Sequence, residues 1–236
     1  MDYEDLEKLA GLGKGAFDHV PRYARNDAIK SVLKVRELED SQLLRPGLYY
    51  IALIDMCGST AASSVLGMET NKERIEQFIR YAIQALQNIQ LTNQAQFIRD
   101  IGDAALLLFS AFKDIIKWSA AVDELHHTYN AACDAEGKPT VFRMESKKVI
   151  HAGEITFSDK TNPISHAVNQ VFKIEKEFKA GETGCTDAVR RVIQPMISSG
   201  ELGAEEVNRV TLPGNEEMSP IWRITTIAEP SRKEHA

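Results

Sequence analysis

Two aspartates that stand beside glycine-containing turns are the residues of this chain with the clearest chemical potential. Asp55 directly follows the apolar, β-rich run at residues 49–54, and a stretch of small residues comes after it: Cys57, Gly58, Ser59 and Thr60. A carboxylate at a strand end beside free backbone N–H groups suits a metal-bound phosphate, because the cation binds oxygens and the phosphate binds amides. The alternative is that Asp55 only caps the end of a strand.

Asp103 supplies a second carboxylate in a comparable position. It follows Gly102 between strand-like runs at residues 95–101 and 104–109, which predicts a hairpin with Asp103 at its tip. A short helix at residues 61–67 and a long amphipathic helix at residues 70–90 separate Asp55 from this hairpin. If the first strand and the hairpin are neighbours, both carboxylates reach one edge of the sheet, in the outline of a two-metal phosphoryl-transfer site.

The remaining elements must position these residues. Spacing predicts a helix at residues 112–132, two strand-like pieces within 140–154, helices at 164–178 and 187–197, and closing strands at 207–212 and 221–227. Residues 1–46 predict an N-terminal helical arm that covers the core or binds a partner, and residues 229–236 a polar tail. Strands alternating with long helices indicate an α+β (α/β sandwich) fold with helices packed on a mixed or antiparallel sheet.

Composition narrows the classes of function. The chain has 236 residues, 43% hydrophobic and 26% charged, with a net charge of −6, which argues against a sequence-independent nucleic-acid binder. The absence of a long apolar run or a basic secretory signal favours a cytoplasmic protein without a membrane span. Three widely separated cysteines indicate reduced thiols rather than a zinc site. The P-loop and the protein-kinase glycine-rich loop are both missing, so those classes are disfavoured.

Four segments in this order resemble the catalytic domain of class III nucleotidyl cyclases: IDMCGST (54–60), IRDIGDAALLLF (98–109), VIHAGEI (149–155) and AVNQVFKIEK (167–176). The resemblance implies a cyclase domain over residues 47–228 with a ferredoxin-like βαββαβ core. It also implies a homodimer in which two domains pair head to tail and share active sites at their interface.

The resemblance assigns roles residue by residue. Asp55 and Asp103 bind two Mg²⁺ or Mn²⁺ ions, with the Met56 carbonyl as a further ligand. The amides of Cys57, Gly58, Ser59 and Thr60 face the triphosphate. From the partner, Asn169 orients the ribose and Lys173 contacts the transition-state phosphate. These two residues lie four apart, on one face of a helix, and Lys173 replaces the usual arginine by a point charge.

The positions that read the base depart from purine cyclases. Those enzymes commonly carry a lysine and an aspartate where this chain has Arg99 and Asn162. A guanidinium can donate two parallel hydrogen bonds to a pyrimidine carbonyl edge, and Tyr50 would add an aromatic wall that narrows the pocket for a smaller base. For Tyr50, packing in the core is an equal alternative. This combination resembles the Pycsar antiphage pyrimidine cyclases of bacteria.

The sequence therefore predicts a cyclase that converts UTP, or less favourably CTP, to the 3′,5′-cyclic monophosphate and pyrophosphate. The resemblance implies that the product is a second messenger read by a separate effector in antiphage defence. Two alternatives stay open: an adenylate or guanylate cyclase with other base contacts, and a degenerate cyclase fold that only binds nucleotide.

Overall fold

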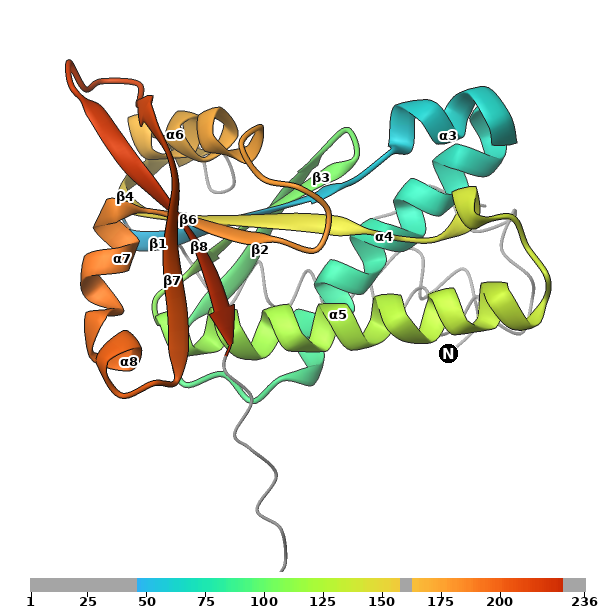
Figure 1. The fold of residues 1–236 in the computed structure, drawn as a ribbon, viewed down its shortest axis with the longest axis horizontal. Helices are drawn as coiled ribbons and strands as arrows, with labels where there is room; N and C mark the ends of the chain where they lie inside the picture. The colour runs from blue at the N-terminus through green and yellow to red at the C-terminus, as the bar shows by residue number, and fades with distance from the viewer. Residues whose placement is uncertain (1–45, 158–162, 227–236) are drawn as a thin grey trace, which may run out of the picture. The chain divides into compact units, whose positions relative to one another are not determined.

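The strands of the computed structural model, which describes residues 46–157 and 163–226, build one mixed sheet (Figure 1). Its order is β2-β3-β1-β4-β6-β8-β7, with β5 paired to β4 outside this path. Every pairing along the path is antiparallel except that of β4 with β6. The bounds are β1 Gly47–Met56, β2 Ala95–Ile101, β3 Ala104–Phe109, β4 Ser146–Phe157, β5 Pro163–Ile164, β6 Thr183–Thr186, β7 Leu202–Thr211 and β8 Met218–Thr226.

Helices pack on both faces of this sheet. In Figure 1, α4 and α5 lie on one side and α6 lies on the other. The bounds are α3 Ser59–Leu66, α4 Met68–Asn88, α5 Phe112–Ala135, the 3₁₀ turn η1 Thr140–Phe142, α6 His166–Glu175, α7 Asp187–Val192 and α8 Gln194–Ser198. The order β1-α4-β2-β3-α5-β4, with strands arranged β2-β3-β1-β4, confirms the predicted βαββαβ core and the α+β class.

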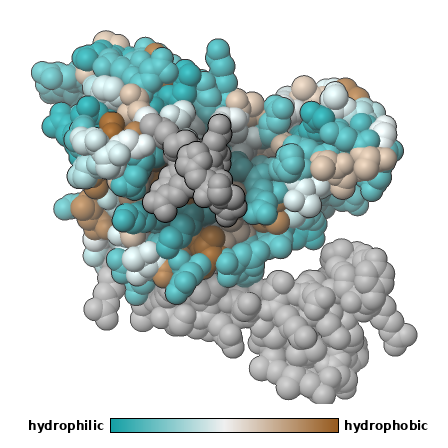
Figure 2. Space-filling view, turned by 60° about the horizontal axis from the view of Figure 1, so that its bottom comes forward, coloured by the Kyte–Doolittle hydropathy of each residue, from teal (hydrophilic) through white to brown (hydrophobic). Residues whose placement is uncertain are grey.

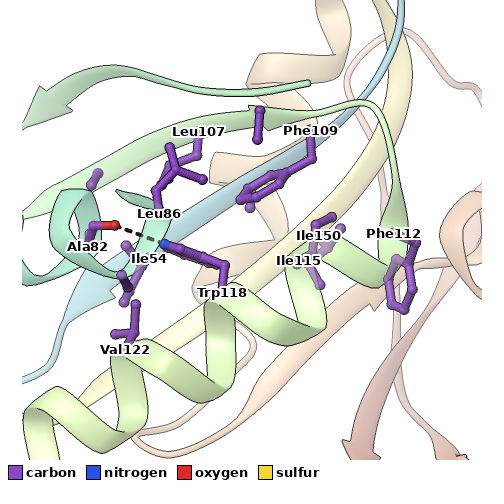
Figure 3. Close-up of a cluster of buried hydrophobic side chains, with 14 of the residues drawn as sticks. Ile54, Ala82, Leu86, Leu107, Phe109, Phe112, Ile115, Trp118, Val122 and Ile150 are labelled. Atoms are coloured by element: carbon purple, nitrogen blue, oxygen red, sulfur yellow. Dashed lines mark hydrogen bonds between the residues drawn. The ribbon is translucent and has the colours of Figure 1, made fainter. Parts of the chain in front are cut away.

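β1 lies inside the sheet between β3 and β4 and is buried on both faces from Ile51 to Ile54. Because side chains alternate along a strand, Ala52, Ile54 and Met56 enter the core under α4 and α5, and Asp55 projects to the opposite face. Figure 3 shows the centre of that core, where Trp118 donates from Nε1 to the Ala82 carbonyl at 2.9 Å. Its hydrogen bond ties α5 to α4.

Two predicted segments differ from the structure. In place of the two strand pieces expected within residues 140–154, the structure has the turn η1 followed by the single strand β4. The turn forms because the Phe142 N–H donates to the Pro139 carbonyl and the Arg143 N–H donates to the Thr140 carbonyl. The expected helix at 187–197 is split into α7 and α8, since Pro195 cannot donate its backbone nitrogen to a continuing helix.

The short strands β5 and β6 were not predicted. Their sequences, Pro-Ile and Thr-Gly-Cys-Thr, are too short for a period-two pattern, and both are held by pairing with longer strands. The predicted helical arm, the C-terminal tail and Asn162 lie outside the described residues, except for Pro46.

On the face in Figure 2, hydrophilic residues dominate and hydrophobic ones are scattered. In residues 46–157 and 163–226, no helix combines the length and apolarity needed to cross a bilayer. The exposed large hydrophobic residues are separated along the chain: Leu48, Val65, Met68, Val192 and Met218.

The burial of two histidines predicts that the free energy of unfolding depends on pH. Burial lowers the pKa of His126 and of His151 from 6.5 to about 4. The unfolded chain then binds more protons below pH 6.5, so stability is complete above that pH and falls as pH approaches 4. Each histidine should cost about 2 kcal/mol of unfolding free energy between pH 7.5 and pH 5. Urea denaturation of wild type and of a variant at each histidine, at the two pH values, measures this loss as the difference between the proteins.

A matched pair of variants isolates the contribution of His126. This ring stacks on Phe78 at 5.2 Å between centroids, and its Nε2 has no hydrogen-bond partner in the described structure. His126→Leu should remove about half of the pH dependence attributed to the two rings. His127→Gln, a change at the exposed neighbouring position, should leave the dependence unchanged. An unaltered slope in His126→Leu would assign the loss to other groups.

Candidate active site

The two predicted metal-binding aspartates come together at the end of β1. Asp55 pairs in register with Ala104, the residue after Asp103, and the Met56 N–H donates to the Asp103 carbonyl at 3.1 Å. Gly102 allows the tight hairpin turn because its φ is +66°. The strand register therefore places both carboxylates at the same end of the paired strands β1 and β3, as the spacing of the sequence predicts.

The turn after Asp55 leads directly into α3. Gly58 precedes this helix in a left-handed conformation, φ 74°, and the first hydrogen bond of the helix runs from the Ala62 N–H to the Gly58 carbonyl. The first N–H groups of a helix have no partner within it, so those of Ser59 and Thr60 are suited to an anion. The Ser59 hydroxyl also donates to Oδ2 of Asp103, which joins the turn to the second carboxylate.

The Cys57 amide differs from its predicted role. It donates to the Glu145 carbonyl at 2.8 Å and so connects the turn to the segment before β4. Since this N–H is used within the fold, the predicted triphosphate contact is left to the amides of Gly58, Ser59 and Thr60.

Lys147 and Glu175 are site residues that the sequence reasoning missed. Lys147, opposite Asp55 in the β1–β4 register, places its Nζ 3.5 Å from Oδ2 of Asp55 and forms an ion pair with Glu175 of α6. All three side chains are at most 20% exposed. The signal was available in the sequence, because the segment before VIHAGEI carries a lysine at the strand position that antiparallel pairing sets against Asp55.

The charges in this cluster affect one another. Burial, followed by the negative charges of Glu175 and Asp103, raises the pKa of Asp55 from 3.8 to about 7, although Lys147 opposes the shift. Burial disfavours the charge on Lys147, but Glu175 and Asp55 together raise its pKa above the usual value. The site therefore holds more negative charge than Lys147 alone compensates, which favours binding of further cations.

The donor set fits divalent metal ions that also bind a substrate. Across the described ranges, no group of three or more His, Cys, Asp or Glu side chains is arranged to hold a metal. Mg²⁺ is usually held by one or two carboxylates together with substrate phosphates, so two aspartates beside a phosphate-binding turn are sufficient. Asp55 and Asp103, with the Met56 carbonyl, would hold such ions.

Asn169 and Lys173 lie together on the exposed side of α6. The helix begins at a cap in which the Ser165 hydroxyl accepts from the Ala167 N–H at 2.9 Å, and its apolar side buries Val171 and Ile174. The two predicted catalytic side chains are therefore exposed, and their role in a partner's active site stays a prediction. The end of the same helix carries Glu175, which forms an ion pair with Lys147 beside Asp55 of its own chain.

The base-binding predictions fall at separate places. Arg99 is exposed on the edge strand β2, beside a register shift between Phe97 and Arg99. Tyr50 is on the opposite face of β1 from Asp55, and its ring meets Phe112 edge-on at 5.8 Å between centroids. This contact agrees with the packing alternative for Tyr50. The role of both residues in reading a base stays a prediction.

Comparisons with known proteins address the fold. No protein-family model and no curated protein sequence matches the chain. Among solved structures, the adenylyl cyclase CyaB from P. aeruginosa superposes with a TM-score of 0.60 at 16% identity, over 78% of this chain and 97% of that one. The chain has the fold of class III nucleotidyl cyclase catalytic domains.

Two further structures share this fold. The adenylate/guanylate cyclase/hydrolase from Silicibacter pomeroyi has a TM-score of 0.56 at 17% identity, over 78% of this chain and 100% of that one. A non-canonical dimeric guanylyl cyclase domain from Blastocladiella emersonii has a TM-score of 0.57 at 12% identity, over 78% of this chain and 99% of that one. The described core therefore spans a whole catalytic domain of this architecture.

Lys147 allows a prediction about the charge of the site. Lys147→Met keeps the apolar stem but removes the cation between Asp55 and Glu175, so a triphosphate placed at this site would lose a charge partner. We expect KM for the nucleoside triphosphate to rise about 10-fold or more, measured by initial rates of pyrophosphate release. Lys176→Met, at an exposed lysine after α6, is the matched control. Equal KM values in the two variants would remove Lys147 from substrate binding.

Proposed function

We propose that this protein is a nucleotidyl cyclase that forms a 3′,5′-cyclic nucleotide and pyrophosphate from a nucleoside triphosphate. One observation carries the proposal: Asp55 and Asp103 meet at a strand end directly beside an anion-suited turn, with Lys147 in the same cluster. A fold alone hosts many functions. This site adds the charge and donor types that phosphoryl transfer requires.

The geometry suggests how the residues of the chain divide the reaction. The ribose 3′-oxygen forms a bond to the α-phosphorus while the bond from that phosphorus to the bridging oxygen breaks, and pyrophosphate leaves. When bound, two divalent cations supply activation of the 3′-hydroxyl and neutralise the triphosphate. The amides at Ser59 and Thr60, with Lys147, hold the β- and γ-phosphates. The proton of the 3′-hydroxyl passes to solvent.

The second half of the site is proposed to come from a second copy of the chain. Asn169 and Lys173 face outward on α6, where they can orient the ribose and stabilise negative charge at the α-phosphate of a partner's substrate. A guanylyl cyclase domain with this fold is described as a non-canonical dimer, which supports dimerisation of such a domain but not this particular pairing. The active sites would then lie at the interface of a homodimer.

The proposed substrate is UTP, with CTP as the weaker choice. Arg99 stands where purine cyclases commonly carry lysine, and its planar fork suits adjacent acceptors on a pyrimidine. We further propose that the cyclic pyrimidine product acts as a second messenger for a separate effector in antiphage defence. The three cysteines are free thiols, which supports a reducing compartment such as the cytoplasm.

A cyclisation assay tests the proposal at its general level. The purified protein is incubated with a mixture of all four nucleoside triphosphates and Mn²⁺, and products are identified by mass spectrometry. A cyclic nucleotide with one equivalent of pyrophosphate is expected. If triphosphates bind but no cyclic product forms under any metal condition, the chain is a nucleotide-binding module instead.

A further inference from the structure

Two buried polar residues of α4 hold the phosphate-binding turn from behind. Asn71 Nδ2 donates to the Ser59 carbonyl at 3.1 Å, and Arg74 Nη1 donates to Asn71 Oδ1 at 3.4 Å. Ser59 in turn donates its hydroxyl to the Asp103 carboxylate. A continuous series of hydrogen bonds therefore runs from a candidate metal ligand, through the turn, into the interior of α4.

Arg74 also holds the segment on the other side of the turn. Its Nε donates to the Phe142 carbonyl at 3.3 Å, and its Nη2 donates to the Arg143 carbonyl at 2.6 Å. Carbonyls at the end of a helical turn carry partial negative charge, so they suit a guanidinium. Two residues further along, the Glu145 carbonyl accepts from the Cys57 N–H at 2.8 Å.

These contacts place one side chain between two parts of the candidate site. On one side Arg74 reaches the turn through Asn71, and on the other it fixes the stretch that leads into β4 and Lys147. Asn130 of α5 secures the same stretch by donating to the Met144 carbonyl at 2.9 Å and accepting from the Met144 N–H at 2.7 Å. The spacing between the phosphate turn and Lys147 is thus set by buried hydrogen bonds.

The charge on Arg74 is unusual for a purely structural residue. Its side chain is only 5% exposed, no described acid forms an ion pair with it, and burial lowers its pKa. A buried cation without an anion costs free energy. A neutral hydrogen-bond donor would hold the same carbonyls at lower cost, whereas a triphosphate at the adjoining turn supplies the negative charge that Arg74 lacks.

We propose that Asn71 and Arg74 are positioning residues for the triphosphate and metal half of the active site. Asn71 orients the Ser59 peptide and, through the Ser59 hydroxyl, the Asp103 carboxylate. Arg74 fixes Asn71 and the approach to Lys147, and its charge stabilises the bound triphosphate from behind the turn. This inference rests on the proposed cyclase function, but it concerns residues that do not touch the substrate.

Variants separate this role from a general effect on stability. Asn71→Ala removes the hydrogen bond to the Ser59 carbonyl. Arg74→Met removes both the guanidinium hydrogen bonds and the positive charge, whereas Arg74→Lys keeps the charge alone. Trp118→Phe is the matched control, because it removes another buried hydrogen bond to α4, that between Trp118 and the Ala82 carbonyl, away from the turn. Each protein is compared by thermal unfolding, by kcat and KM, and by Mn²⁺ binding.

Mn²⁺ affinity is measured by electron paramagnetic resonance with 3′-deoxy-UTP, which cannot cyclise, so this readout does not depend on turnover. Loss of groups that orient a metal ligand typically costs 10- to 100-fold, and we expect about that loss in Mn²⁺ affinity and in kcat/KM for Asn71→Ala and Arg74→Met. Arg74→Lys should recover part of the KM effect. Trp118→Phe should lower only the unfolding temperature.

The inference is overturned if folded Asn71→Ala binds Mn²⁺ and turns over like Trp118→Phe at equal loss of stability. If Arg74→Met does not fold, Asn71→Ala and Arg74→Lys decide the question. A wild-type protein that binds Mn²⁺ with the analogue but never cyclises a nucleotide would reject the proposed function, while the difference in Mn²⁺ affinity would still test the positioning role.

Discussion

Asp55→Ala or Asp103→Ala should lower kcat for cyclisation roughly 10³-fold or more, because loss of a metal ligand removes several kcal/mol of charge stabilisation in the transition state. Initial rates of cyclic product formation measure the effect. Asp100→Ala is the control, since Asp100 is an exposed acid on the same hairpin. Near-full turnover in either variant at the paired aspartates would contradict the two-metal assignment.

The unfolding temperature of an Asp55 variant shows whether its lost turnover comes from lost chemistry or from an unfolded protein. The folded-state pKa of Asp55 is raised from 3.8 to about 7, chiefly by burial and then by Glu175 and Asp103. The ionised carboxylate therefore destabilises the metal-free fold, by an amount that grows as pH rises from 3.8 to 7 and is complete above it. Asp55→Asn should consequently raise the unfolding temperature of metal-free protein at pH 8 while abolishing turnover. A fall in that temperature would contradict the raised pKa.

The second large effect concerns the shared active site. Asp55→Ala and Asn169→Ala should each be nearly inactive as homodimers, because every site would lack one essential group. When the two variants are unfolded together and refolded, half of the dimers combine both chains and contain one intact site. Activity should then return to about a quarter of wild type.

The control for this mixing experiment combines two variants that both affect the proposed metal-binding half of the site. Asp55→Ala mixed with Asp103→Ala cannot create an intact metal site, so no recovery is expected. Recovery in that control, or none in the Asp55→Ala and Asn169→Ala mixture despite heterodimer formation, would place Asn169 in the same chain's site or outside catalysis.

The sequence predicted the elements that carry strong periodic patterns. Buried β1, the long helices α4 and α5 and the hairpin around Asp103 were recognisable because their apolar residues repeat over many positions. The proximity of Asp55 and Asp103 followed from the short connections between these elements. Short strands such as β6 have too few residues for a pattern, and only pairing with β4 and β8 defines them.

The supporting residues of the site were harder to predict. Lys147 belongs to the site because strand register sets it opposite Asp55, and Glu175 because α6 packs beside β1. Asn71 and Arg74 lie on α4, and the amphipathic pattern of this helix predicts only that it packs on the core. Their hydrogen bonds to Ser59 and Phe142 depend on tertiary contacts that no local spacing encodes.

Arg99 and Tyr50 are the two described residues that the sequence predicts to bind the base, and the structure places them differently. The pyrimidine prediction depends on Arg99, which stands where purine cyclases commonly carry lysine and which lies exposed on the edge strand β2. Tyr50 packs against Phe112, away from the face of β1 that carries Asp55. Arg99→Lys is therefore the more informative substitution for base selectivity.

The most direct test of the proposal is to incubate wild-type protein separately with UTP, CTP, ATP and GTP, each with Mn²⁺, and to quantify every cyclic product. Cyclic UMP is predicted as the main product, with less cyclic CMP, and with loss of product in Asp103→Ala. Cyclic AMP or cyclic GMP as the main product would contradict the pyrimidine assignment, and no cyclic product from any triphosphate would contradict the enzyme itself.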